Sequence, residues 1–307
     1  MGRVRTILVA SDHSRYGRHA ESRAAMLGAE LNADAVEVMS VCNRKAERHL
    51  HSPLDADPAN VVASDAASRG PAVAVPALFR RDAEPVQSHV PGSGVGPAAI
   101  VERANRIGAD LTVTASRQEN FLAGLVARLR NHELIRLSDR PVLLINREPT
   151  AAYRKVLVAV DFSAESMQAA RLALAVAPTA QFTFLHAFRV AEIEMMTAHG
   201  VASDSMDTYR TRAEEAARAR LNSFINSLGP RRQWIHRTAE HGVPTPVIYA
   251  HAEETSADLI AVGKHGKSRF VDLFLGSVTQ RLIDYSDCDL LITTSHSEET
   301  SATPPAA

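Results

Sequence analysis

The sequence predicts an α/β fold in which two similar units, each built on a mainly parallel sheet, follow one another along the chain. Short apolar runs alternate with longer amphipathic segments of helical period, an order typical of parallel α/β sheets. The apolar runs are continuous, as expected for strands covered by helices on both faces. The pattern repeats after about 150 residues, a period far too long for a solenoid, which indicates tandem domains.

The repeat is gapless near the end of each unit. Residues 109–114 (ADLTVT) align with 257–262 (ADLIAV), an offset of 148 positions, and 139–145 (DRPVLLI) align with 287–293 (DCDLLIT) at the same offset. The polar C-terminus ends in Pro-Pro-Ala-Ala and is expected to be disordered. The expected boundaries are a first domain at 1–147, a second domain at 153–295 and a tail at 296–307.

The elements of the second unit follow from their own patterns. Apolar runs predict the strands, and the segment 207–228 places Ala213, Leu221 and Phe224 on one helical face, which predicts core packing. Pro244 stands where the next helix begins, a position that proline tolerates. We expect strands near 155–160, 181–188, 233–239, 258–262 and 289–293, and helices near 164–177, 207–228, 245–254 and 277–286.

The first unit starts in the same way but is less regular. The run 6–10 (TILVA) predicts a strand, 15–29 a helix and 36–41 a second strand. Residues 49–69 contain two prolines and several aspartates, which indicates a loop or a degraded helix. Residues 92–96 (GSGVG) resemble a phosphate loop only superficially, and we interpret them as a loop before a helix.

Composition limits the functions that this chain can have. The net charge of -1 provides no field that favours nucleic acid or membrane. Cys42 and Cys288 lie far apart and fit neither a disulfide framework nor a zinc site, which indicates a reducing compartment. The N-terminus shows no apolar segment of signal type, and no run approaches the length of a bilayer span. We therefore expect a cytoplasmic protein with no nucleic-acid or membrane partner.

The main functional signal is the pattern G-x2-G-x9-G-S, formed by Gly263, Gly266, Gly276 and Ser277. It follows the apolar run 258–262 and precedes a short predicted helix. Glycines let the backbone come close to a ligand, and a helix N-terminus offers free N–H groups and partial positive charge. The sequence therefore predicts a site for the phosphates of a nucleotide.

Simpler interpretations of the same residues stay open. Ser277 and Gln280 fit a capping box, which needs no ligand, and the glycines fit ordinary turns. The basic residues of the segment can add positive charge to the site or can lie in solvent. These residues are Lys264, His265, Lys267 and Arg269.

The duplicated unit, Asp161 after the strand at 155–160, and the glycine pattern together resemble a tandem universal stress protein of the branch that binds ATP. The resemblance implies two doubly wound five-stranded parallel sheets of order 3-2-1-4-5, as in adenine nucleotide alpha hydrolase-like folds. Ligands of such sheets lie at the carboxyl ends of the strands where the order reverses. That arrangement would bring Asp161 beside the glycine segment.

The resemblance also assigns roles to individual positions. Asp161 would lie near the adenosine portion or a phosphate-bound metal, although it also fits a turn or cap near Ser163. Ala187 would lie beside adenine, and Mg²⁺ would bridge phosphate oxygens. The residues implied to bind ATP are Asp161, Ala187, Val262, Gly263, His265, Gly266, Gly276, Ser277, Val278 and Thr279.

The first unit departs from the glycine pattern. At the offset of 148, the four key positions are occupied by larger residues: Ala115, Gln118, Arg128 and Leu129. Side chains would stand where the backbone has to approach phosphate, although Asp12 remains. We therefore expect one ATP site per chain, in the second unit.

Three functional hypotheses remain at this stage. The first is an ATP-binding stress-response or regulatory module, with its two units paired as a pseudo-dimer or two chains paired as a homodimer, and with a protein partner that the sequence does not identify. The second is a slow ATPase or an adenylyl-transferring enzyme, although the sequence contains neither a Gly-x-Ser-x-Gly elbow nor an HExxH motif. The third is an interaction scaffold that needs no nucleotide.

Overall fold

The computed structural model describes residues 3–41, 79–80, 96–116, 121–190, 203–230, 232–265 and 275–294. Several expectations lie outside these residues: the loop at 49–69, most of the segment 92–96, Cys42, and the tail at 296–307.

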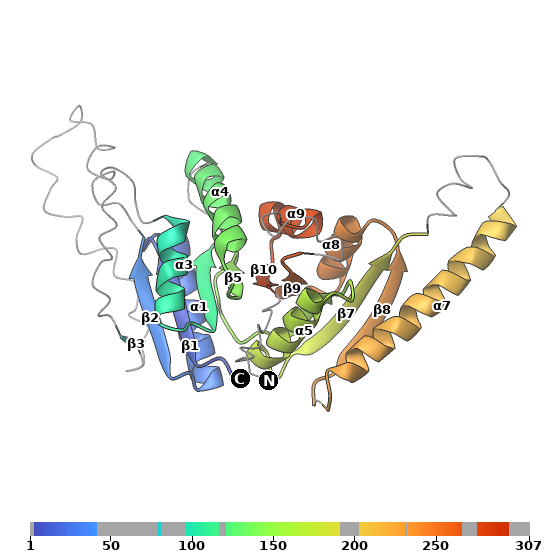
Figure 1. Cartoon of the computed structure of the whole chain (residues 1–307), viewed down its shortest axis with the longest axis horizontal. Helices are drawn as coiled ribbons and strands as arrows, with labels where there is room; N and C mark the ends of the chain where they lie inside the picture. Colours follow the sequence, from blue (N-terminus) through green and yellow to red (C-terminus); the bar gives the residue numbers. More distant parts are fainter. Residues whose placement is uncertain are drawn as a thin grey trace, which may run out of the picture.

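The described residues form a sheet of ten strands with helices on both faces (Figure 1). The first unit comprises β1 (Thr6–Ser11), α1 (Arg15–Leu31), β2 (Ala35–Ser40), β3 (Phe79–Arg80), α3 (Pro97–Arg106), β4 (Leu111–Ala115), α4 (Phe121–Leu137) and β5 (Val142–Ile145). The second unit comprises β6 (Lys155–Ala159), α5 (Ala164–Val176), β7 (Gln181–Phe188), α7 (Ser203–Ser227), β8 (Ile235–His241), α8 (Pro244–Glu254), β9 (Leu259–Gly263), α9 (Ser277–Tyr285) and β10 (Asp289–Thr293).

The strand order confirms the predicted doubly wound topology. The sheet runs β3-β2-β1-β4-β5-β10-β9-β6-β7-β8, so that each unit has the order 3-2-1-4-5 and all strand pairs within a unit are parallel. Helices α1, α5 and α7 pack on one face through one hydrophobic cluster, and α3, α4, α8 and α9 pack on the other through a second. Every strand and helix expected in the second unit is present within a few residues of its predicted bounds.

The two units join through their last strands, which makes one continuous sheet rather than two separate ones. Strands β5 and β10 pair antiparallel, with Leu143 opposite Leu291. These two leucines are equivalent at the offset of 148, so the units are related by a pseudo-two-fold axis at this pair. The sequence left open whether these edges pair within one chain, and the structure pairs them within it.

A buried polar network lies beside this junction. Asp289, only 1 % exposed, accepts hydrogen bonds from the hydroxyl of Tyr153 at 2.7 Å and from the backbone N–H of Asn146 at 2.9 Å. Arg23 of α1 lies 3.5 Å from the same carboxylate and stacks over the Tyr153 ring at 4.0 Å. The hydrogen bonds and the nearby guanidinium offset the cost of burying the carboxylate only in part, because burial still raises the pKa of Asp289 above its usual value. The network ties the first unit and the linker to β10.

Candidate functional site

A cavity of about 360 Å³ opens in the second unit at the carboxyl ends of β6, β7 and β9. The chain leaves β6 for β7 on one side, and β9 pairs on the other side of β6, so the cavity lies at the topological switch point of this sheet. Of the ten residues predicted to bind, Gly266 lies outside the described residues. The other nine all line the cavity: Asp161, Ala187, Val262, Gly263, His265, Gly276, Ser277, Val278 and Thr279.

Helix α9 directs its N-terminus into the cavity. Its N-cap is Gly276, whose own N–H donates to the carbonyl of Lys264 at 3.0 Å. The first bond within the helix runs from Gln280 N–H to the Gly276 carbonyl at 2.9 Å. The amides of 277–279 therefore have no acceptor inside the helix and are directed at the cavity. The capping-box interpretation is wrong, because Ser277 is the first helical residue rather than the N-cap.

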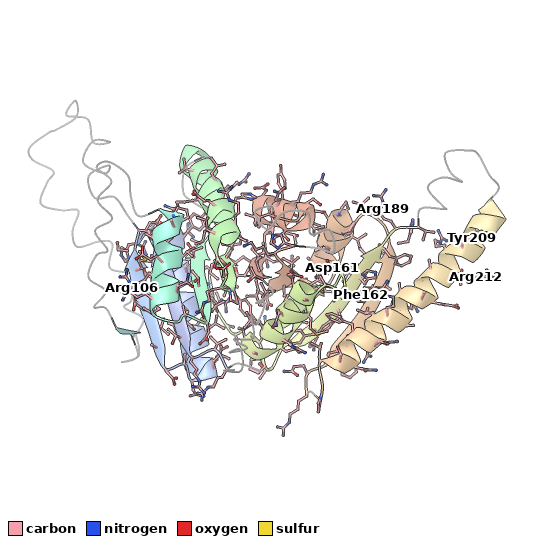
Figure 2. The ribbon with its side chains drawn as sticks, in the orientation of Figure 1. Arg106, Asp161, Phe162, Arg189, Tyr209 and Arg212 are labelled. Atoms are coloured by element: carbon pink, nitrogen blue, oxygen red, sulfur yellow. The ribbon has the colours of Figure 1, made fainter. Side chains whose placement is uncertain are left out.

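Asp161 lies in the turn between β6 and α5, where Figure 2 labels it. It also lines the cavity. Its Oδ1 accepts hydrogen bonds from the N–H of Ser163 at 2.9 Å and from the Ser163 hydroxyl at 2.5 Å. Ser163 is the N-cap of α5, where its Oγ accepts from the N–H of Ser166 at 3.1 Å. Both sequence interpretations of Asp161 are thus compatible: it supports the cap of α5 and presents a carboxylate to the cavity.

Gly263 is a glycine because helix α5 approaches it closely. A Cβ at this position would lie 2.7 Å from the Cβ of Glu165 and 3.1 Å from the backbone N of Ser166. Sequence reasoning attributed this glycine to ligand approach or to a turn. The structure adds a third reason, which is packing of the helix against the strand.

The backbone of Ala187 is exposed at an edge where β6 and β7 separate. The last bond between these strands runs from Val160 N–H to the Leu185 carbonyl at 2.8 Å. Residues alternate along a strand, so the N–H and C=O of Ala187 point to the same side as those of Leu185, beyond the end of β6. The Val160 carbonyl accepts instead from Nδ1 of His186 at 2.7 Å. A donor and an acceptor of the main chain thus face the cavity side by side.

Lys264 does not contribute its charge to the cavity. Its ammonium group is buried in the junction between the units, where it donates to the carbonyls of Arg136 at 2.8 Å and Ser138 at 3.1 Å. Lys264 therefore fits neither alternative that the sequence left open, because it does not line the cavity and does not lie in solvent. Lys267 and Arg269 lie outside the described residues.

The first unit lacks an open helix end at the corresponding place. Helix α4 runs without a break from Phe121 to Leu137, so Arg128 and Leu129 lie in its middle, where α9 begins in the second unit. The amides of these two positions have acceptors within the helix. This finding explains physically why larger residues are tolerated there.

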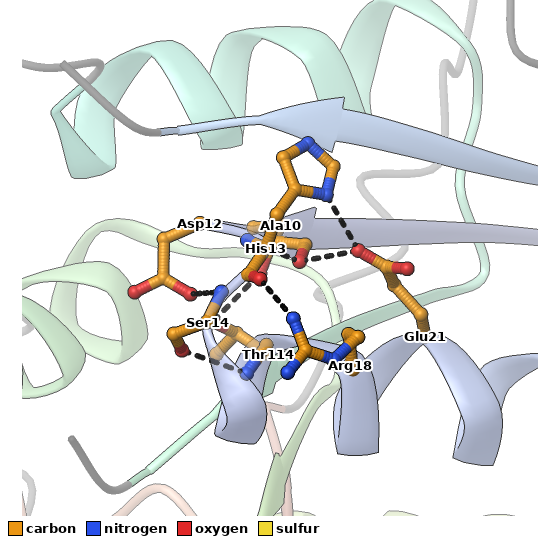
Figure 3. A network of polar contacts seen from close by, with 9 residues as sticks. Ala10, Asp12, His13, Ser14, Arg18, Glu21 and Thr114 are labelled. Atoms are coloured by element: carbon orange, nitrogen blue, oxygen red, sulfur yellow. Dashed lines mark hydrogen bonds and ion pairs between the residues drawn. The ribbon is translucent and has the colours of Figure 1, made fainter. Parts of the chain in front are cut away.

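The strand end of the first unit keeps part of the pattern (Figure 3). Ser14 donates its N–H to Asp12 Oδ1 at 3.0 Å, as Ser163 does to Asp161. His13 and Ser11 both contact Glu21 Oε1, at 2.8 and 2.6 Å. The aspartate turn is therefore common to both units. Gln118 lies outside the described residues.

Sequence reasoning missed part of the cavity wall. The sequence predicts only a helix start at Pro244, although its position shortly after the end of β8 could have indicated a role in the site. The cavity residues that were not predicted are Ala159, Val160, Ser166, Leu185, Pro244, Ile248 and Leu275. Most of them are apolar, and the sequence pattern does not distinguish them from ordinary core residues.

Two further properties concern the described part of the chain. No helix there combines the length and the apolar content that a membrane crossing requires. Nor do these residues contain a group of three or more His, Cys, Asp or Glu side chains that could hold a metal ion.

Comparison with known proteins identifies similar chains. The model of the universal stress protein family matches residues 3–146 and again residues 152–294. Universal stress protein MJ0531 of Methanocaldococcus jannaschii is 28% identical over 142 residues, which cover 46% of this chain and 81% of that protein. A universal stress protein from Archaeoglobus fulgidus has a similar fold, with a TM-score of 0.57, 17% identity, and coverage of 97% of this chain and 98% of its own. A family protein from Arabidopsis thaliana, solved with AMP bound, covers 49% of this chain and 98% of its own, with 17% identity and a TM-score of 0.30.

Proposed function

The chain belongs to the universal stress protein family across both of its units, and from this premise we propose that the second unit binds an adenine nucleotide, ATP with Mg²⁺, as a stress-response or regulatory module. The observation that carries the proposal is the open N-terminus of α9, which lies in a cavity at the switch point of the sheet. Such a terminus favours anions through free amides and partial positive charge.

Two surfaces of the cavity suit the two ends of the nucleotide. The N–H and C=O of Ala187 complement the edge of adenine, which offers a ring nitrogen as acceptor and an exocyclic amino group as donor. Leu185, Pro244 and Ile248 supply apolar wall for a base. At the other end, the amides of 277–279 would hold phosphate oxygens. The cavity volume falls within the range of small-molecule sites.

Asp161 supports the magnesium part of the proposal. Mg²⁺ commonly binds through one or two carboxylates together with substrate phosphates and waters, rather than in a cage made only of protein. The single carboxylate of Asp161, placed beside the phosphate end, is consistent with this mode of binding. The same carboxylate also accepts two hydrogen bonds from Ser163, which supports a positioning role more than that of a base that activates water.

We place one nucleotide site in each chain, in the domain at 153–295. The continuous helix α4 supports this assignment, because it removes the free amides from the equivalent place in the domain at 1–147. The pairing of β5 with β10 makes the chain a pseudo-dimer on its own. A regulatory role in the cytoplasm through a protein partner completes the proposal.

Thermal unfolding with and without ATP and Mg²⁺ tests the proposal. At about 100 times its Kd, a ligand adds about 2.7 kcal/mol to the stability of a protein that it binds only when folded. The variant Gly276→Arg should lose this gain, because the new side chain would occupy the phosphate end. Gly96→Arg is the matched control, since Gly96 is the N-cap of α3 and has open space around it. Equal gains in wild type and Gly276→Arg would contradict the proposal.

A further inference from the structure

Lys264 connects three elements at one point. Its backbone N–H donates to the carbonyl of Thr293 in β10 at 2.7 Å, and its carbonyl accepts from the N–H of Gly276, the N-cap of α9, at 3.0 Å. Its side chain crosses the junction between the units and reaches the end of α4. Lys264, which directly follows β9, is thus held by contacts with both units.

The end of α4 is a suitable partner for this cation. Helix α4 ends at Leu137. The carbonyls of its last turn accept no hydrogen bonds from N–H groups within the helix and carry partial negative charge. The carbonyls of Arg136 and Ser138 both accept from Lys264 Nζ. Lys264 is only 4 % exposed, and a buried ammonium is stable only when it is hydrogen-bonded. Its position is therefore fixed by the first unit.

The equivalent position in the first unit carries a shorter, uncharged side chain. At the offset of 148, Lys264 corresponds to Ser116, whose N–H donates to the carbonyl of Ile145 at 3.0 Å just as Lys264 does to Thr293. The backbone arrangement is thus duplicated. The long cationic side chain occurs only in the unit whose helix end is open, and serine is too short to make the same span.

A second contact across the junction joins the middle of α4 to the last residues of α9. Nε2 of His132 in α4 lies 2.8 Å from Oδ1 of Asp284 in α9, and the guanidinium of Arg128 lies 5.9 Å from the ring centre of Tyr285. Figure 1 shows α4 and α9 as neighbours above β5 and β10. The C-terminal end of α9 is therefore in contact with α4, and the N-cap of α9 is linked to α4 through Lys264.

We propose that the first unit, in which α4 runs through the place equivalent to the start of α9, serves as the support for the phosphate end of the site in the second unit, with Lys264 as the positioning residue. This inference rests on the proposed function. Lys264 acts through Gly276: by fixing the carbonyl that holds the Gly276 N–H, it sets the direction of the amides of 277–279. A preorganised set of donors binds an anion more tightly than one that must first be ordered.

Binding of ATP and of adenosine to three variants tests the inference. Lys264→Met keeps the length of the side chain but removes the ammonium group, and we expect about tenfold weaker binding of ATP with unchanged binding of adenosine, since only the phosphates contact α9. Lys264→Arg should restore ATP binding to within about threefold, because a guanidinium can donate to the same two carbonyls. Arg140→Met is the control, because Arg140 also donates to a carbonyl, that of Ala109 at 3.1 Å, but this bond lies within the first unit.

Hydrogen exchange of the Gly276 amide provides a readout that needs no ligand. Without the ammonium anchor, the bond from Gly276 N–H to the Lys264 carbonyl should open more often, and we expect exchange at least about tenfold faster in Lys264→Met than in wild type or Arg140→Met. Exchange at the wild-type rate together with unchanged ATP affinity would overturn the inference. If wild type binds neither ATP nor adenosine, the proposed function fails. The exchange rates then still decide whether the Lys264 side chain stabilises the bond between the Gly276 N–H and the Lys264 carbonyl.

Discussion

The hydroxyl of Thr279 donates to the carbonyl of Gly263 at 2.8 Å and thereby fixes the first turn of α9 to the end of β9. The first unit makes the equivalent bond with another residue type: the amide of Asn131 donates to the carbonyl of Ala115 at 3.3 Å. Both units therefore hold helix to strand at the same point. They differ in where the helix begins: α9 starts at this point and has N-terminal amides without acceptors inside the helix, whereas α4 is continuous there.

This pair of bonds predicts different effects in the two units. Thr279→Val removes the donor and leaves the Gly263 carbonyl buried without it, which should lower the free energy of unfolding by about 1–3 kcal/mol and weaken ATP binding several-fold. Asn131→Leu should reduce stability by a similar amount and leave ATP affinity unchanged. Urea denaturation and calorimetric titration measure the two quantities. Unchanged ATP affinity in Thr279→Val would contradict the assignment of the phosphate end to the first turn of α9.

Because α5 packs closely on Gly263, we expect any side chain at this position to lower the stability of the protein. Gly263→Ala places a Cβ 2.7 Å from that of Glu165, and the resulting overpacking should lower the free energy of unfolding by about 1–3 kcal/mol. The opposite change in the first unit, Ala115→Gly, should cost only about 0.5–1 kcal/mol. Denaturation curves compare the two. A Gly263→Ala variant as stable as wild type would show that the helix can move away.

Asp161 predicts how binding depends on magnesium. Asp161→Asn keeps an oxygen that can accept from Ser163, so the turn should persist, but the negative charge is lost. We expect ATP affinity in this variant to be the same with Mg²⁺ as with a chelator, whereas wild type should bind more tightly with Mg²⁺. Asp12→Asn, the matching change in the first unit, should leave the magnesium dependence intact. A magnesium effect of unchanged size in Asp161→Asn would remove Asp161 from the metal site.

The Tyr153–Asp289 bond predicts a dependence of stability on pH. Burial, and secondarily the charge of Asp289, raise the pKa of Tyr153 well above its usual value of 10.0. A group whose pKa is raised on folding stabilises the protein fully below its unfolded pKa, and this contribution is lost as the pH rises toward the folded value. The difference in unfolding free energy between wild type and Tyr153→Phe should therefore be constant from about pH 7 to 9 and should shrink above about pH 10. A difference that stays constant to pH 11 would contradict this account.

Periodicity was enough to predict the strands and helices of the second unit, because these follow from short local patterns. The strand order, the switch point and the nine predicted residues that line the cavity came instead from the resemblance to universal stress proteins. The long helix α4 was not predicted. Its first residues align at the offset of 148 with a segment before α9 that lies mostly outside the described residues, so the repeat offered no helical pattern to transfer. Local sequence patterns also could not predict where the Lys264 side chain points. Its partners, the carbonyls of Arg136 and Ser138, are more than a hundred residues away in sequence.

The number of nucleotides bound per chain tests the central claim most directly. Calorimetric titration with ATP and Mg²⁺, combined with native mass spectrometry of the same sample, should find one nucleotide per chain in wild type and none in Gly276→Arg. Two nucleotides per chain, or one that persists in Gly276→Arg, would contradict a single site at the N-terminus of α9.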